Sequence, residues 1–242
     1  MIEIARLNGL RPWQQEKHYV QSLVLNSVSE MQLVFKGGTY LWFFHGLRRF
    51  SDDLDFTAFG SLPDDVPERV SDDLKLFGVE NGLKKLSDDE RSLSFRISAK
   101  GPLNTTVRDM CFVYVEISRR ESVLEDRVAL RFDRPEYQLP IKSLSGMALD
   151  EVGAEKIRTI MTRDKPRDVY DLYYLISKKG IKFRKGLVDK KLQYYKEAYS
   201  AEKLAQKIEK VESAYVRELK SLVFEELPDF ERVSNIINKW TS

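Results

Sequence analysis

The sequence predicts an α+β fold, in which a first half built from a mixed sheet with helices (residues 1–148) precedes an all-helical half (residues 149–242). Short strand-like apolar segments alternate with helical patterns in the first half, whereas from about Leu149 the apolar residues recur at helical spacing. With 42% hydrophobic and 11% aromatic residues, the 242-residue chain can bury a substantial core. This composition excludes disorder for most of the chain.

The elements of the first half follow from local patterns. Apolar residues at helical spacing predict a first helix over 13–31. Residues 93–99 and 110–117 read as two paired strands, and because neither is continuously apolar, one face of the pair is expected to meet solvent. The other elements expected in this half are a strand over 33–35, a helix over 40–45 closed by Gly46, a turn entering a strand over 48–56, a loop over 60–67 and a helix over 66–77.

In the second half, only helices are expected. Pro166 follows Asp164 and Lys165 and suits the first position of a helix, where its missing N–H costs no hydrogen bond. The predicted helices cover 150–162, 166–177, a long charged segment over 189–226, and 228–240.

Composition also limits the chemistry. The single cysteine, Cys111, cannot form an intramolecular disulfide, and with only His18 and His45 the chain lacks the residues for a zinc site or a histidine triad. The charged N-terminus does not read as a signal peptide, and no apolar run approaches the ~20 residues of a membrane span. We therefore expect a soluble, cytoplasmic protein.

Two local patterns suggest where chemistry takes place. The strand over 33–35 runs into Lys36-Gly37-Gly38-Thr39 and then a helix, so bare backbone N–H groups at a helix start offer a seat for phosphate. Asp53 and Asp55 lie two residues apart entering the next strand, which directs both carboxylates to one face. Two carboxylates forced together repel unless a cation lies between them, and Mg²⁺ suits such oxygen ligands.

A third carboxylate, Glu116, interrupts an otherwise apolar and aromatic strand, where a charged residue seldom serves packing. Asp53, Asp55 and Glu116 together would form the three-carboxylate, two-metal site of nucleotidyl transfer. An Asp-x-Asp pair alone is weak evidence, and Asp53-Leu54-Asp55-Phe56-Thr57 also matches phosphatases with an aspartyl nucleophile. The preceding residues are too polar for the strand that such phosphatases place there.

Two segments resemble the AbiEii-type nucleotidyltransferase toxins, members of the DNA polymerase β-like nucleotidyltransferase superfamily that act in type IV toxin–antitoxin or abortive-infection pairs, with the MenT toxins as relatives. The first is Lys36-Gly37-Gly38-Thr39-x-Leu41 with Arg49-Phe50-Ser51-x-Asp53-Leu54-Asp55-Phe56. The second is Ala154-Glu155-Lys156-Ile157-Arg158 with Arg163-x-Lys165-Pro166-Arg167-Asp168-x-Tyr170-Asp171-Leu172. The matched blocks cover roughly 45 residues, and their order extends over about residues 15 to 180.

The resemblance implies a polymerase β-like palm whose active cleft the helical half completes. It implies Mg²⁺ (or Mn²⁺) as cofactor, an NTP as substrate, transfer of NMP to an acceptor such as the 3′ end of a tRNA, and a separately encoded antitoxin. Arg49 either contacts a phosphate or braces the Asp53/Asp55 strand, and Asp171 has a simple alternative role as the i,i+4 ion-pair partner of Arg167. The expected site therefore comprises Asp53, Asp55, Lys156 and Asp168 for catalysis, Lys36, Gly37, Gly38, Thr39, Arg49 and Ser51 for the nucleotide, and Asp53, Asp55 and Glu116 for the metal.

Charge is distributed unevenly along the chain. Residues 1–150 hold 20 Lys and Arg against 23 Asp and Glu, a net charge of −3, whereas residues 151–242 hold 20 against 15, a net charge of +5. Lys178–Lys210 adds four aromatic residues to 11 basic and 4 acidic ones. This segment either binds RNA through lysines and stacking tyrosines or is an ordinary solvated helix face. Three alternatives stay open: a non-catalytic nucleic-acid-binding module, a phosphatase with Asp53 as its nucleophile, and transfer of the nucleotide to a protein.

Overall fold

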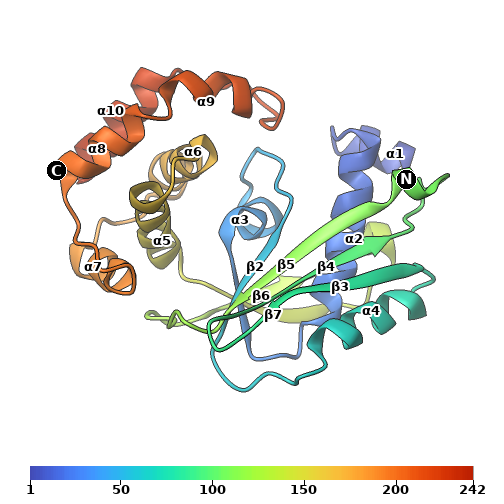
Figure 1. Cartoon of the computed structure of the whole chain (residues 1–242). Coiled ribbons are helices and arrows are strands. Elements are labelled where there is room, and N and C mark those ends of the chain that lie inside the picture. Colours follow the sequence, from blue (N-terminus) through green and yellow to red (C-terminus); the bar gives the residue numbers. More distant parts are fainter. Residues whose placement is uncertain (242) are drawn as a thin grey trace. The chain divides into compact units, whose positions relative to one another are not determined.

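The computed structural model describes residues 1–241, which divide into two compact units (Figure 1). The sheet unit comprises Met1–Phe44, Ser51–Val123 and Arg127–Gly146. The helical unit comprises His45–Phe50, Leu124–Asp126 and the chain from Met147 onward. The mixed fold expected from the sequence is confirmed. No helix within residues 1–241 combines the length and hydrophobicity that crossing a membrane requires.

The sheet unit is built on one seven-stranded mixed sheet with the strand order β3-β4-β5-β2-β1-β7-β6. The pairs β1/β7 and β2/β5 are parallel, and the other neighbouring strands are antiparallel. The strands are β1 (Leu33–Lys36), β2 (Leu54–Ala58), β3 (Asn81–Asp88), β4 (Ser92–Ala99), β5 (Cys111–Ser118), β6 (Val128–Phe132) and β7 (Lys142–Gly146). The helices of this unit are α1 (Ile2–Leu7), α2 (Pro12–Ser27), α3 (Gly37–His45, whose last residue belongs to the helical unit) and α4 (Val66–Leu76), with 3₁₀ turns at Val107–Asp109 and Pro135–Tyr137.

The two faces of the β3–β4–β5 region differ in character. One face carries fully buried apolar residues such as Phe95 and Val113 and is covered by α2, which contacts β5, and α4, which contacts β3. In Figure 1, α2 lies behind these strands. On β5, buried and exposed residues alternate from Cys111 to Glu116, which confirms the expectation of one solvated face. We call this solvated side of β3, β4 and β5 the open face.

The predicted strands over 93–99 and 110–117 correspond to β4 and β5, which pair as expected, and their pairing is antiparallel. The strands β3, β6 and β7 were not anticipated. β3 and β6 lie at the two edges of the sheet, where much of each strand meets solvent, so both lack a continuous apolar pattern. The three segments are thus held as strands by pairing with neighbours, which local sequence does not reveal.

The helical unit contains α5 (Leu149–Thr162), α6 (Pro166–Tyr174), a π-helical turn (Leu175–Lys179), α7 (Lys185–Gln193), α8 (Ala201–Glu209), α9 (Glu212–Leu219) and α10 (Phe230–Thr241). The prediction of one long helix over 189–226 is wrong, because the segment is divided among α7, α8 and α9. Two features mark the break between α7 and α8. Lys196 adopts a left-handed conformation with φ 55°, and the Ser200 side chain caps α8 by accepting a hydrogen bond from the Lys203 N–H.

Two short segments that precede residue 147 in sequence belong to the helical unit. Arg48 to Phe50 pairs with the strand-like segment at Val223: the Phe50 N–H donates to the Leu222 carbonyl and the Phe224 N–H to the Arg48 carbonyl, both at 2.8 Å. The N–H groups of Leu124 and Glu125 donate to the two carboxylate oxygens of Glu151, each at 2.9 Å. The helical unit is therefore assembled from three separate stretches of chain.

Candidate active site

A row of charged residues crosses three neighbouring strands of the sheet unit. In the β1/β2 register Lys36 lies opposite Asp55, and in the β2/β5 register Asp55 lies opposite Glu116. Residues in register on adjacent strands are about 4.8 Å apart and point to the same side of a sheet. Asp53 lies two residues before Asp55, just before β2 begins at Leu54, so the three predicted metal-binding carboxylates lie on or next to two neighbouring strands.

The glycine turn after β1 is built against the Asp-x-Asp segment. The strand ends at Lys36 and α3 begins at once with Gly37, whose φ is +78°. A Cβ on Gly37 would lie well inside van der Waals contact of Asp55 Oδ2 and 3.0 Å from Asp55 Cβ. Glycine is thus required twice here, for its backbone conformation and for the close approach to the carboxylate.

Thr39 provides a second tie between this turn and the carboxylates. Its buried hydroxyl donates to the backbone carbonyl of Asp53 at 2.5 Å. As in any α-helix, the first N–H groups of α3 have no carbonyl acceptor within the helix. The predicted phosphate seat, Gly37 to Thr39, and the predicted carboxylates, Asp53 and Asp55, therefore belong to one local structure.

The other predicted nucleotide-binding residues of this unit lie close by and are buried. Lys36 forms an ion pair between its Nζ and Glu121 Oε2 at 2.7 Å. The Ser51 carbonyl accepts a hydrogen bond from Gln21 Nε2 at 3.1 Å, and the same amide donates to the Asp52 carbonyl at 2.9 Å. Helix α2 thus fixes the backbone that leads into Asp53.

The donor set fits a hard divalent cation in kind. Asp53 and Asp55 are half-buried and Glu116 is exposed, and all offer the carboxylate oxygens that Mg²⁺ and Mn²⁺ prefer. The turn at Gly37, which a Cβ would block, leaves the Asp55 carboxylate room beside the backbone. Across residues 1–241, however, no three His, Cys, Asp or Glu side chains are already gathered as a ligand group, so the fit depends on the register of Asp55 with Glu116 and on the nearness of Asp53.

The remaining predicted residues form a buried ion network inside the helical unit. Arg49 donates through Nε and Nη2 to the two oxygens of Asp171, each at 2.6 Å, and through Nη1 to the Phe50 carbonyl. Lys156 Nζ lies 2.6 Å from Asp171 Oδ2 and 2.9 Å from Asp168 Oδ1. Arg163 completes the network with its Nε 2.8 Å from Asp168 Oδ2.

The charges of this network decide the ionisation of its carboxylates. Burial alone would raise the pKa of Asp168, but the positive charges of Lys156 and Arg163 outweigh it and hold that pKa well below its usual range. Burial opposes ionisation of Asp171 in the same way, and Arg49 with Lys156 lowers its pKa. Both carboxylates therefore stay ionised at neutral pH, with no exposed surface of their own.

Asp171 is the residue whose importance local sequence understated. The i,i+4 spacing offered Arg167 as its partner, whereas in the structure Asp171 pairs with Arg49 and Lys156. Two roles were open to Arg49: contact with a phosphate, or bracing of the Asp53/Asp55 strand. In the structure its guanidinium is 2% exposed and is bound to Asp171 through two nitrogens. Local sequence gives no sign of the Arg49–Asp171 pairing, because it joins residues 122 positions apart.

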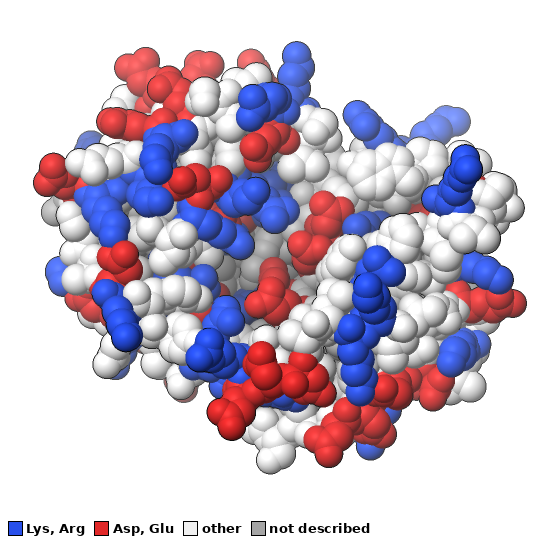
Figure 2. Space-filling model, in the orientation of Figure 1, with Lys and Arg blue, Asp and Glu red and all other residues white. Residues whose placement is uncertain are grey.

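Six of the 11 basic residues in Lys178–Lys210 form ion pairs with carboxylates. Lys191 is buried between Glu151 (2.5 Å) and Glu155 (3.1 Å). Among its aromatic residues, Phe183 packs against Tyr199 and Trp240, with ring centroids 5.1 and 5.4 Å away. Figure 2 shows acidic and basic side chains interspersed over the helices of this unit. Other lysines of the segment with acidic partners are Lys185, Lys203, Lys207 and Lys210.

The sequence matches one family model of known proteins. The family model described as nucleotidyl transferase AbiEii toxin, type IV TA system, matches residues 21–236. No curated protein matches the sequence significantly.

Solved structures share the fold at low sequence identity. MenT4, a nucleotidyltransferase toxin from Mycobacterium tuberculosis, is 22% identical with a TM-score of 0.66, and the alignment covers 99% of this chain and 87% of that one. JHP933 from Helicobacter pylori is 17% identical with a TM-score of 0.63, covering 96% and 91%. A protein from the same organism that is described as a proposed nucleotidyltransferase is 16% identical with a TM-score of 0.69, covering 96% and 94%. At these identities the likeness establishes the fold.

Proposed function

The chain belongs to the AbiEii family of nucleotidyltransferase toxins of type IV toxin–antitoxin systems, and from this membership we propose that it transfers a nucleoside monophosphate from an NTP to the 3′ end of an RNA, with tRNA as the first acceptor to test. The observation that carries the proposal is the register that sets Asp55 beside Glu116, with the glycine turn pressed against Asp55. Carboxylates next to a phosphate seat are what nucleotidyl transfer requires.

In this proposal Asp53, Asp55 and Glu116 hold Mg²⁺ or Mn²⁺. When bound, a divalent cation supplies neutralisation of triphosphate charge and polarises the phosphoryl oxygens. Backbone N–H groups of the turn from Gly37 to Thr39 bind phosphate oxygens at the start of α3. The acceptor hydroxyl attacks the α-phosphorus, the bond from that phosphorus to the β-phosphate oxygen breaks, and pyrophosphate and a proton leave.

Around that centre, the buried neighbours keep the reacting groups in place. Lys36 adds positive charge next to Asp55 and is itself held by Glu121. Thr39 and Ser51 fix the backbone on either side of the carboxylates through their contacts with Asp53 and Gln21. Such fixed geometry lowers the reorganisation that the transfer step needs.

For the helical unit, we propose that activity depends on the network of Arg49, Lys156 and Asp168. The 2.9 Å contact between Lys156 Nζ and Asp168 Oδ1 supports a role for Asp168 in holding Lys156. Removing any one member leaves a buried charge without its partner, which is costly. A cognate antitoxin, implied by the family, is expected to be encoded separately and to restrain this activity.

The decisive experiment offers the purified protein each of four α-³²P-labelled NTPs with Mg²⁺ or Mn²⁺, together with total tRNA or, separately, total protein. The test variant is Asp53→Asn/Asp55→Asn, and Asp72→Asn, an exposed carboxylate on α4, is the matched control. Label on tRNA with wild type and with the control, but not with the test variant, supports the proposal and identifies the nucleotide.

Other outcomes separate the rival functions. Label on protein would keep the chemistry and replace the acceptor. No label from any NTP with either acceptor, from protein shown to be folded, would refute nucleotidyl transfer to these acceptors. It would also favour a non-catalytic nucleic-acid-binding module.

A further inference from the structure

We propose that the open face of the sheet is a stacking platform for single-stranded RNA, formed by Phe112 and Tyr114 of β5, Arg96 of β4 and Lys84 of β3. The platform leads directly to the Asp55–Glu116 pair. This inference deepens the proposed function, because it states which part of the chain holds the acceptor and in what form.

The two aromatic residues occupy positions where a solvated strand face normally carries polar side chains. Phe112 is 39% exposed and Tyr114 is 40% exposed, whereas the residues between and beside them, Cys111, Val113 and Val115, are buried. Two partly exposed aromatic side chains on one strand face leave apolar area in contact with water, and covering that area is favourable. Their flat rings suit the faces of nucleic-acid bases.

Along β5 the spacing connects the platform to the carboxylates. Phe112, Tyr114 and Glu116 are successive residues of the same face, and each step of two residues is about 6.6 Å. Glu116 in turn lies opposite Asp55. An RNA whose last nucleotide reaches Asp55 and Glu116 would place its preceding bases over Tyr114 and then Phe112.

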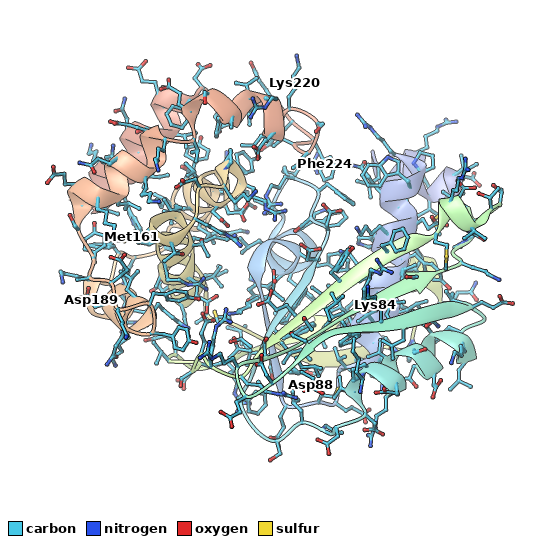
Figure 3. All side chains as sticks on the ribbon, viewed as in Figure 1. Lys84, Asp88, Met161, Asp189, Lys220 and Phe224 are labelled. Carbon is cyan, nitrogen blue, oxygen red and sulfur yellow. The ribbon has the colours of Figure 1, made fainter. Side chains whose placement is uncertain are left out.

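Two cations accompany the aromatic residues. In the β4/β5 register Arg96 lies opposite Tyr114, and in the β3/β4 register Lys84 lies opposite Arg96. The Arg96 guanidinium lies over the Phe112 ring at 4.9 Å from its centroid. Figure 3 labels Lys84 on the near side of the sheet, and in Figure 2 a run of Lys and Arg side chains crosses these strands.

Neither cation is neutralised by a carboxylate within the described residues. Across residues 1–241 neither Lys84 nor Arg96 forms an ion pair, and Arg96 Nε is buried without a hydrogen-bond partner. The contrast with Lys85 is direct, since this neighbour points to the covered face and pairs with Glu68 at 3.0 Å. Half of the ten lysines of Lys178–Lys210, the other basic region, are paired with carboxylates, whereas Lys84 and Arg96 form no ion pair within the described residues and can meet phosphates.

These features favour single-stranded RNA over a duplex or a protein. Base faces are free for stacking only where a strand is unpaired. An interface with a protein would need a broader apolar patch than these two rings provide. Here the aromatic residues are bordered by Ser94 and Ser98 of β4, which share the open face. Aromatic rings on β5 beside cations on β4 and β3 match the way that single strands are bound.

The test measures binding of a fluorescein-labelled 12-nucleotide single-stranded RNA to the full chain by anisotropy, without NTP. We expect Phe112→Ala and Tyr114→Ala each to weaken binding about tenfold, because each removes one stacking contact. Tyr114→Phe, which keeps the ring, should bind as wild type does. Phe77→Ala is the matched control, since Phe77 is equally exposed (39%) but follows α4 away from the platform.

Salt dependence tests the cations separately. Lys84→Gln should lower the slope of log Kd against log salt by about 0.7, the value for one phosphate contact on a single strand, and Arg96→Gln should do the same. Lys85→Gln should leave the slope unchanged. A duplex of the same sequence should bind equally to wild type and to Phe112→Ala.

Unchanged affinity in a folded Phe112→Ala/Tyr114→Ala variant would overturn the platform, even if label transfer to tRNA is normal. A loss of antitoxin binding in that variant with RNA binding intact would also overturn it and would assign the surface to a protein. If RNA binds as expected but no NTP is used, the platform stands and the proposed reaction fails. The two proposals can therefore fail independently.

Discussion

Replacing Gly37 by alanine tests the central feature of the candidate site, the contact between the glycine turn and Asp55. The new Cβ would overlap Asp55 Oδ2 and would lie 3.0 Å from both Cβ and Cγ of Asp55. Because the overlapping group is a short side chain rather than the end of a long one, the carboxylate must turn away. The substitution should therefore reduce both stability and nucleotidyl transfer.

The magnitude can be separated into two parts. An L-residue at a φ of +78° costs about 1–2 kcal/mol in unfolding free energy relative to glycine. Inserting a methyl group into an occupied space typically costs about 1–3 kcal/mol more. Gly78 has the same φ of +78° with nothing within 4 Å of its added Cβ, so Gly78→Ala isolates the backbone part. We expect a loss of about 1–2 kcal/mol for Gly78→Ala and about 2–5 kcal/mol for Gly37→Ala.

The assay is urea unfolding of both variants beside wild type, followed by the same comparison in an Asp55→Ala background. Without the carboxylate, the excess cost of Gly37→Ala over Gly78→Ala should shrink, although the contact with the Asp55 Cβ position is kept. Transfer of label from NTP should fall in Gly37→Ala and stay near wild type in Gly78→Ala. Equal costs for the two glycine variants, or an excess that is the same with and without the Asp55 carboxylate, would refute the close-approach reasoning.

Three further predictions concern buried charges, each read by denaturant unfolding. Asp171→Asn should lower the unfolding free energy by about 3–5 kcal/mol, because it leaves the buried cations Arg49 and Lys156 without the negative charge that they share. Asp164→Asn removes only exposed ion pairs and should lower it by less than about 1 kcal/mol. Lys191→Met should lower the unfolding free energy by a similar amount, about 3–5 kcal/mol, because it leaves the carboxylates of Glu151 and Glu155 without the cation between them. A loss of less than about 1 kcal/mol would contradict this account. Burial lowers the pKa of His18 from 6.5 to about 3, so the unfolded chain binds a proton that the native chain rejects; stability should fall as pH drops from about 6.5 to 3, by up to about 1.4 kcal/mol per pH unit, and His18→Gln should flatten that slope.

Much of the carboxylate region could be predicted because its signals are local. Asp53 and Asp55 are two residues apart at the start of a strand, and Glu116 is the one charged residue within β5, so each could be identified without a partner. Gly37 and Gly38 directly after an apolar strand likewise pointed to a tight turn. What the local pattern lacks is the sheet order, which alone places β2 beside β5 and Asp55 opposite Glu116.

The features that escaped prediction depend on distant pairing. Arg49 and Asp171 are 122 residues apart, and the nearer Arg167 offered a plausible but wrong partner. Strand β3 is held by its pairing with β4, because its own sequence, which contains an asparagine, a glycine, two lysines and one aspartate among eight residues, has low strand propensity. The long helix predicted over 189–226 fails at Lys196, whose left-handed conformation no residue type announces.

The three-part composition of the helical unit has a consequence for how the protein is made. During synthesis Arg49 leaves the ribosome long before Asp171, its partner in the buried network. The Arg49 guanidinium therefore has no Asp171 carboxylate to pair with until 122 further residues have been made. A fragment that begins at Met147 would also lack partners for two of its buried carboxylates. Asp171 would be without Arg49, and Glu151 would be without the N–H groups of Leu124 and Glu125. A chain interrupted early would thus yield no intact helical unit, and a growing cell would hold this toxin in an unassembled form until translation is nearly complete.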